Sequence, residues 1–137
     1  MIEEDIRAYL LIDKPILCLE SALSYWGIGT YHRLNPQVFA DVSEVTFVGV
    51  GSYVPNKFGD SDIDKLNDKS IPATTPFRAI CEMIIYDRRE ELIYEALDDM
   101  INTLDVSEKI IMEYAAKYGV IKQMEYYLET LDEEIGY

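Results

Sequence analysis

The spacing of apolar residues in the second half of the chain predicts helices. Between positions 77 and 85, apolar side chains recur three and four residues apart, so a helix would carry them on one stripe that must be buried. Thr75 is a good N-cap because its hydroxyl can accept from an orphan backbone amide, and Pro76 fits the first helical position. A short extended run, 71–74, leads into this helix. The stripe consists of Phe77, Ile80, Cys81, Ile84 and Ile85.

Arg78 lies beside this stripe in the first helical turn. The helix dipole disfavours a cation there by roughly 0.3 to 1 kcal/mol. Two interpretations remain open at this stage: an arginine on the surface, or one that an acidic partner within the domain holds in place.

Three further helices follow the same rules. The segment 90–101 has an apolar stripe and an acidic outer face. Ser107 can cap a helix that ends at Gly119, a natural left-handed residue, and Val120 to Leu131 forms the last helix. The inward residues are expected to be Leu92, Ile93, Ala96, Leu97, Met100 and Ile101, then Ile110, Ile111, Tyr114, Ala115 and Tyr118, then Ile121, Met124, Leu128 and Leu131.

The first thirty residues predict two more helices. Apolar residues four apart indicate a short helix in the first dozen residues, and a second helix is expected to begin at Pro15 and to stop at Gly27. Trp26, at the end of the second helix, either closes the core or faces a partner.

The middle of the chain loses the helical period and predicts a small sheet. The segment 38–42 is a possible strand, and 45–50 is the best one, with apolar residues on both faces that indicate cover on both sides. The segment 51–69 is expected to be a long polar connection that returns to the strand 71–74. The expected fold is a single α+β domain over residues 1–137, mostly helical, in which a small sheet of 45–50 and 71–74 is flanked by N-terminal helices and a C-terminal helical bundle.

Composition places the chain among ordinary globular proteins. Hydrophobic residues are 49 % and charged residues 28 % of the 137. No apolar run approaches the ~20 residues that cross a bilayer, and the first ten residues are acidic where a signal peptide is basic, so a cytoplasmic protein without membrane contact is expected. Cys18 and Cys81 lie in apolar patterns and are expected to be reduced core residues. No cofactor is expected.

The formal net charge of -14 narrows the choice of partners. Affinity for nucleic acid comes mainly from Lys and Arg that neutralise phosphates, so direct binding to nucleic acid is not expected. The charge is compatible with a basic protein partner and equally with general solubility.

One pattern points to an enzyme. Gly51 and Ser52, followed by Asp62 and Asp64, resemble the nucleotidyltransferase signature, in which a Gly-Ser pair holds triphosphate and two aspartates bind magnesium. Alternate residues of a strand share a face, so two such carboxylates can hold two cations about 4 Å apart. Against this, Pro55 interrupts the segment, polar residues follow Asp64, and no later strand offers a third carboxylate. The other interpretations of Asp60, Asp62 and Asp64 are a calcium loop, which lacks the required glycine, and a solvated acidic loop. His32 is expected to be a loop residue.

Tyrosines in the helical half are candidates for partner contact. Tyr94 and Tyr126 fall off the apolar stripes, and a tyrosine on a wet helix face combines large area with one polar group. We take the acidic, tyrosine-bearing side of the last three helices as the candidate partner surface, with partly buried rim tyrosines as the alternative. The candidate partner-binding residues are Tyr94, Tyr126, Tyr127 and Glu129.

Three segments resemble a known family. Leu19 to Ile28 (LESALSYWGI) resembles the Ser-Ala-Leu helix and glycine turn of AbiEi-type antitoxins, the antitoxin half of type IV toxin and antitoxin pairs. Ile71 to Ile85 (IPATTPFRAICEMII) resembles their strand, turn and Arg-bearing helix, and Val106 to Leu131 resembles their closing helices.

The resemblance implies a non-enzymatic, bacterial antitoxin that neutralises a nucleotidyltransferase-like toxin, often in abortive infection by phage. The matching region begins almost at the first residue, so the chain is expected to be the effector half without the DNA-binding winged helix of many relatives. The family supplies no catalytic residue. Ser21, Arg78 and Glu82 match its motif positions and, with Thr75, are structural or interface candidates. A nucleotidyltransferase-like enzyme and a self-associating structural protein remain the alternatives.

Overall fold

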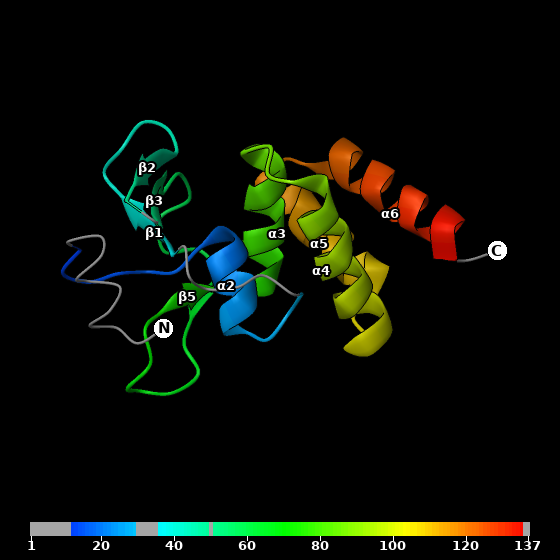
Figure 1. The fold of residues 1–137 in the computed structure, drawn as a ribbon. Coiled ribbons are helices and arrows are strands. Elements are labelled where there is room, and N and C mark those ends of the chain that lie inside the picture. The colour runs from blue at the N-terminus through cyan, green and yellow to red at the C-terminus, as the bar shows by residue number, and fades with distance from the viewer. Residues whose placement is uncertain (1–11, 30–35, 50, 136–137) are drawn as a thin grey trace.

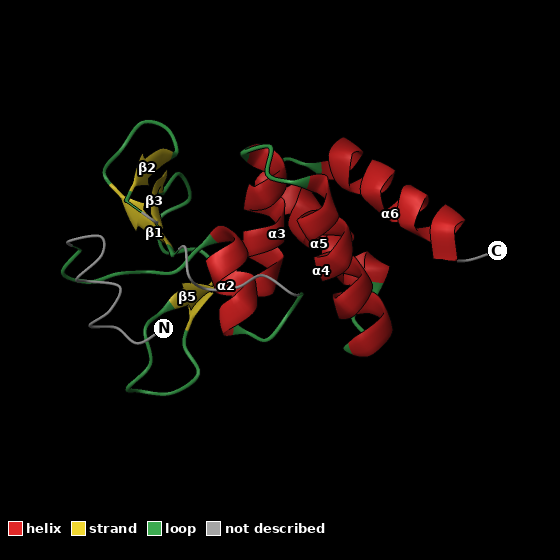
Figure 2. Ribbon diagram, in the orientation of Figure 1, coloured by secondary structure: helices red, strands yellow, loops and turns green. Residues whose placement is uncertain are grey.

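The computed structural model describes residues 12–29, 36–49 and 51–135, and these form the α+β, mostly helical fold that the sequence predicts. Small sheets lie at one end and helices at the other (Figure 2). The helix expected in the first dozen residues lies almost wholly outside the described residues, as does His32.

A three-stranded sheet has the order β1-β3-β2, where β1 is Gln37–Ala40, β2 is Thr46–Val48 and β3 is Gly51–Pro55. β1 runs parallel to β3, and β2 runs antiparallel to it. The expectation of a polar connection from 51 to 69 is therefore wrong at its start. Gly51–Pro55 is the central strand, paired along both edges by β1 and β2, and all of its residues except Tyr53 are buried.

A second, two-stranded sheet pairs β4 (Ile63–Asp64) with β5 (Ala73–Thr74) in antiparallel fashion. The two strands that we expected in one sheet thus belong to different sheets. β2 is also shorter and more exposed to solvent than predicted, and Phe47 is 77 % exposed. β2 lies at the edge of the three-stranded sheet and is largely exposed, so the expectation of cover on both sides is wrong.

The segment before the first described helix is extended. The helix α2 spans Leu19–Tyr25 and does not begin at Pro15 as predicted. Leu17 forms bridges with Val38 and Ala73, donating its N–H to the Pro72 carbonyl at 3.0 Å and accepting from the Thr74 N–H at 3.0 Å. On the side of β1, the Cys18 N–H donates to the Gln37 carbonyl and the Ile16 carbonyl accepts from the Phe39 N–H. Because backbone groups from Ile16 to Cys18 bind both sheets, the chain becomes helical only after Cys18.

The helical half follows the predicted pattern closely. α3 (Pro76–Ile85) packs against α2, and also against α4 (Glu90–Asp98), α5 (Glu108–Tyr118) and α6 (Ile121–Ile135), which places it at the centre of the molecule (Figure 1). A π-helical turn, η1 (Asp99–Thr103), extends α4.

Local signals set the ends of these helices. The hydroxyl of Thr75 accepts from the N–H of Arg78, and the hydroxyl of Ser107 accepts from the N–H of Ile110. Gly119 ends α5 in the left-handed conformation, at a φ of 77°. Both predicted caps and the predicted C-terminal glycine are confirmed.

The core joins the helices to the sheets through α2 and α3. Cys18 and Cys81 are buried and reduced, as predicted. Trp26 donates its ring N–H to the Thr74 carbonyl at 2.8 Å and packs against the core, which favours its structural interpretation. Two residues of the predicted stripes, Ile110 and Ile121, are each 42 % exposed because they lie in first helical turns that no neighbouring element covers fully.

Candidate functional site

Arg78 is the most heavily engaged side chain of the described residues, and it is fully buried. Its Nε donates to Glu82 Oε1 at 3.1 Å, one helical turn further along α3. The acidic partner that the first-turn position requires is therefore on the same helix, and the interpretation of Arg78 as a surface residue is wrong. Burial raises the pKa of the Glu82 carboxyl, and the charge and hydrogen bonds of Arg78 oppose that rise.

The remaining donors of Arg78 bind the loop that follows β3. Nη1 donates to the carbonyls of Gly59 at 2.9 Å and Ser61 at 2.6 Å, and Nη2 donates to Asn56 Oδ1 at 2.6 Å. The guanidinium also lies 4.8 Å from the centre of the Phe39 ring. The buried guanidinium of Arg78 thus holds the loop 56–61 against α3 and packs against Phe39 of β1.

The other residues of the family-like motifs also have structural contacts. Ser21 and Gln37 exchange two hydrogen bonds of 2.9 Å, one from each backbone N–H to the other side chain. These bonds tie the buried first turns of α2 to the start of β1. Ser21, Arg78 and Glu82 lie in the interior, so their side chains shape the fold and do not form an exposed surface.

Asp62 is held by α5. Its Oδ2 accepts from Lys117 Nζ at 2.7 Å and from the Tyr118 hydroxyl, which is also 2.9 Å from Ser61 Oγ. Burial opposes ionisation of Asp62, but hydrogen bonds from Lys117 and Tyr118 outweigh it and lower the pKa of this carboxyl. The same contact and burial raise the pKa of Tyr118. Through these bonds, Asp62 links the segment that follows β3 to α5.

The other members of the nucleotidyltransferase-like pattern lie in different environments. Asp64 is exposed, and its Oδ1 accepts from the N–H of Lys65 at 2.7 Å. Ser52 is buried in the central strand. A magnesium ion at Asp62 would have to displace both Lys117 and Tyr118. Within the described ranges, no group of three or more His, Cys, Asp or Glu side chains is placed to hold a metal ion.

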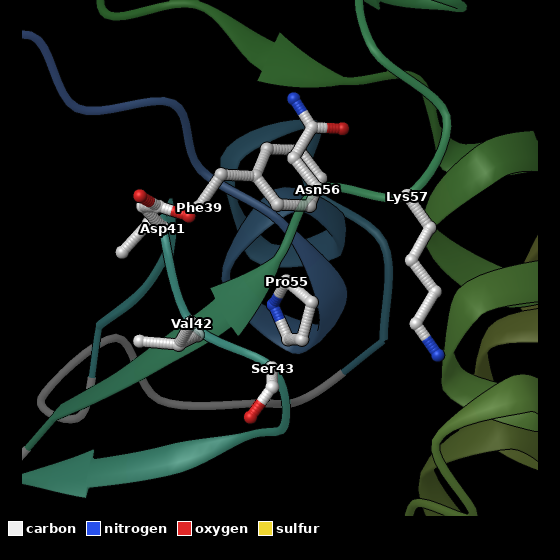
Figure 3. A pocket seen from close by; sticks show the side chains of 8 residues that line it. Phe39, Asp41, Val42, Ser43, Pro55, Asn56 and Lys57 are labelled. Carbon is white, nitrogen blue, oxygen red and sulfur yellow. The ribbon is translucent and has the colours of Figure 1, made fainter.

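A pocket of about 540 Å³ opens beyond the carboxyl ends of the parallel strands β1 and β3. The strands are paired as far as Ala40 and Pro55, and the pocket lies where this pairing ends. Figure 3 shows Phe39 and Pro55 at its centre, with the loop after β1 on one side and Lys57 on the other. The lining residues are Phe39, Ala40, Asp41, Val42, Ser43, Pro55, Asn56 and Lys57.

This pocket offers hydrogen-bonding groups over an apolar base. It carries one ammonium, from Lys57, and one carboxylate, from Asp41, and the Lys57 Nζ lies 5.2 Å from the centre of the Tyr86 ring. The eight lining residues include neither a histidine nor a cysteine, so they can bind a polar ligand but supply no paired base and nucleophile. The pocket was not predicted because 51–55 was expected to be part of a polar connection. The signal was present, since two apolar runs each end in a polar residue, Asp41 and Asn56.

Three of the predicted partner-binding residues do come together. The Tyr94 and Tyr127 rings have centroids 5.0 Å apart at an angle of 60°, and the Tyr126 and Tyr127 rings are 5.9 Å apart at 77°. We call these three residues the tyrosine cluster. It joins α4 to α6, and Tyr126 is 58 % exposed. Tyr94 and Tyr127 are half-buried against the core, as the alternative of partly buried rim tyrosines expects, so Tyr126 is the ring that faces outward.

Acidic side chains surround the cluster. Burial, and then the charges of Glu90 and Asp87 together with the neighbouring tyrosines, raise the pKa of Tyr127. Glu129 is exposed and lies three residues after Tyr126, which places the two side by side on α6. The tyrosines of α5 make contacts within the domain instead. Tyr114 stacks on Phe77, and Tyr118 donates a hydrogen bond to Asp62. The candidate surface therefore narrows from the last three helices to α4 and α6.

No model of a known protein family and no curated protein matches the chain. No helix in 12–29, 36–49 or 51–135 is long and apolar enough to cross a membrane.

Proposed function

We propose that the chain is a non-enzymatic, antitoxin-like protein that binds and neutralises a protein partner through the tyrosine cluster. The observation that carries this proposal is the group of three aromatic rings across α4 and α6, in which Tyr126 is exposed and Tyr94 and Tyr127 are half-buried, on a strongly acidic chain. Tyrosine is enriched among the residues that contribute most to protein interfaces, since it brings large area at low entropic cost. Following the family resemblance, the partner is a nucleotidyltransferase-like toxin, in a system that acts in abortive infection by phage.

The interior supports a binding role over a catalytic one. The side chains of the motif residues Ser21, Arg78 and Glu82 are buried and engaged in hydrogen bonds, so they are not open to a substrate.

The nucleotidyltransferase alternative has less support from the geometry. Its two aspartates differ in their surroundings, since Asp62 is bound by Lys117 and Tyr118 while Asp64 faces solvent. A self-associating protein remains compatible with an exposed aromatic cluster, and the test below distinguishes it.

The test is co-production of the chain with the toxin candidate encoded beside it in the native host. Three forms are compared: the unchanged chain, a Tyr94→Ala/Tyr126→Ala variant, and a Phe47→Ala control. Phe47 is also an exposed ring, and it lies on β2, at the far end of the molecule from α6 (Figure 1). The proposal predicts that the first and third forms restore growth and co-purify with the toxin, and that the double variant does neither.

Equal protection by all three forms would contradict the surface assignment, and failure of every form to protect or to bind would contradict the antitoxin function. Sedimentation of the chain alone completes the test. A mass that falls from dimer to monomer only in the double variant would instead assign the cluster to self-association.

A further inference from the structure

The rings of the tyrosine cluster meet edge to face. At an angle of 77°, Tyr126 is not stacked on Tyr127, so at least one face of the Tyr126 ring is left uncovered by this neighbour. Tyr126 exposes 58 % of its surface. The face of an aromatic ring carries partial negative charge and attracts a cation within about 6 Å of its centre.

Carboxylates flank these rings on both helices. Glu90 and Glu91 lie one turn before Tyr94 on α4, and Glu129 lies one turn after Tyr126 on α6, all of them exposed. The cations nearby are few. Lys122 lies one turn before Tyr126, and Arg89 is already paired with Glu91 at 3.7 Å. The cluster therefore combines one exposed ring, Tyr126, with an excess of negative charge.

Arginine fits this combination better than lysine. The guanidinium is planar, so it can stack on a ring while its N–H groups donate to a carboxylate, whereas the ammonium of lysine is a compact, strongly hydrated charge. The chain shows the same chemistry in its interior, where Arg78 lies over the Phe39 ring and donates to Glu82.

We infer that the tyrosine cluster receives an arginine-bearing basic segment of the partner, with a guanidinium over the Tyr126 ring and hydrogen-bonded to Glu129. This inference rests on the proposed function, because it specifies the partner chemistry of the same surface. The ring supplies preference for arginine over lysine, and the carboxylates supply attraction that weakens with salt.

The test titrates three short peptides into the full chain, with tyrosine ring signals observed by NMR. The peptides alternate glycine with arginine, with lysine, or with the uncharged analogue citrulline. We expect the arginine peptide to bind about threefold or more tighter than the lysine peptide, and the citrulline peptide to bind weakest. Signals of Tyr126 and Tyr127 should shift most.

Matched variants separate a ring effect from general attraction to an acidic protein. Tyr126→Leu removes the ring at unchanged charge and should abolish the preference for arginine, while Tyr126→Phe should keep it. Glu129→Gln should weaken binding of the arginine peptide, and Phe47→Leu, a matched ring on β2, should change nothing. Equal affinities for the arginine and lysine peptides in every form would overturn the inference.

The outcome is separable from that of the proposed function. If Tyr126→Leu prevents capture of the toxin but the peptides are bound without preference, the antitoxin proposal stands and the arginine inference fails. If the peptide preference depends on Tyr126 while toxin capture does not, the arginine site stands and the functional assignment of the surface fails.

Discussion

Arg78 and Glu82 form a buried ion pair one turn apart on α3, with 3.1 Å between Nε and Oε1 and no exposed side-chain surface on either residue. The pair stands at the N-terminal end of the central helix, where a cation is disfavoured by the helix dipole. It persists because the guanidinium also binds Gly59, Ser61 and Asn56. The pair is therefore the point at which α3 holds the loop after β3.

Replacing Arg78 should be among the most damaging single changes in the chain. Arg78→Met leaves the Glu82 carboxylate and two carbonyls unpaired in the interior, so we expect a loss of about 3 to 5 kcal/mol in the free energy of unfolding, measured by urea titration. The double variant Arg78→Met/Glu82→Leu should recover part of this loss, because no charge then remains buried. Arg89→Met, which removes an exposed pair with Glu91, should cost less than about 1 kcal/mol. Equal costs for Arg78→Met and Arg89→Met would contradict the role of the pair.

Asp62 should make stability depend on acid pH. Its pKa in the folded state is lowered below the ordinary 3.8, so the stabilisation it provides is present above pH 3.8 and is lost as the pH falls through the folded-state pKa. Asp62→Asn keeps a side chain that tolerates the left-handed backbone, at a φ of 49°, but removes the charge. The difference in unfolding free energy between the unchanged chain and the variant should be largest near neutral pH and should shrink at acid pH.

Asp64→Asn is the matched control for that experiment, since Asp64 is exposed and bonded only to the neighbouring backbone in the described contacts. It should leave the pH dependence unchanged. A pH profile that Asp62→Asn does not alter would show that the contact with Lys117 and Tyr118 contributes nothing to stability.

The two cysteines should be inert in the folded chain. Both are buried, and burial raises the pKa of Cys81 to about 12, so the reactive thiolate is scarce at neutral pH. A thiol-specific reagent at neutral pH should label neither residue before unfolding and both after addition of urea. Rapid labelling of the native chain would contradict the burial of α2 and α3 against each other.

Magnesium and a nucleoside triphosphate should not bind. Asp62 is already bound by Lys117 and Tyr118, and Ser52 is buried, so the groups of the nucleotidyltransferase-like pattern are not open to these ligands. A calorimetric titration should be flat. Heat that saturates, and that disappears in Asp62→Ala and Asp64→Ala, would establish the enzyme alternative instead.

The sequence predicted the helices well and the sheets poorly, for a physical reason. A helix is specified by neighbours along the chain, and both the stripe after Thr75 and the caps at Ser107 and Gly119 are local signals. A strand is specified by distant partners. Gly51–Pro55 appeared polar and loop-like because nothing within it shows that β1 and β2 will cover its two edges.

In the candidate site, too, local patterns identified single residues but not the contacts between distant segments. The position of Arg78 beside an apolar stripe indicated that it needs an acidic partner, but its loop partners, such as Asn56, could not be inferred from helical spacing. The individual tyrosines could be selected because they fall off the stripes. That Tyr94 meets Tyr127 depends on how α4 packs against α6, which no local pattern encodes.

The affinity of the purified toxin for the chain, compared between Tyr126→Ala and Phe47→Ala, tests the central claim most directly. Both changes remove an exposed ring, and neither ring is needed for the buried core. We predict that Tyr126→Ala weakens binding about tenfold or more, as expected for a central interface residue, and that Phe47→Ala leaves the affinity unchanged. An unchanged affinity for Tyr126→Ala would contradict the assignment of the tyrosine cluster as the surface through which this chain acts.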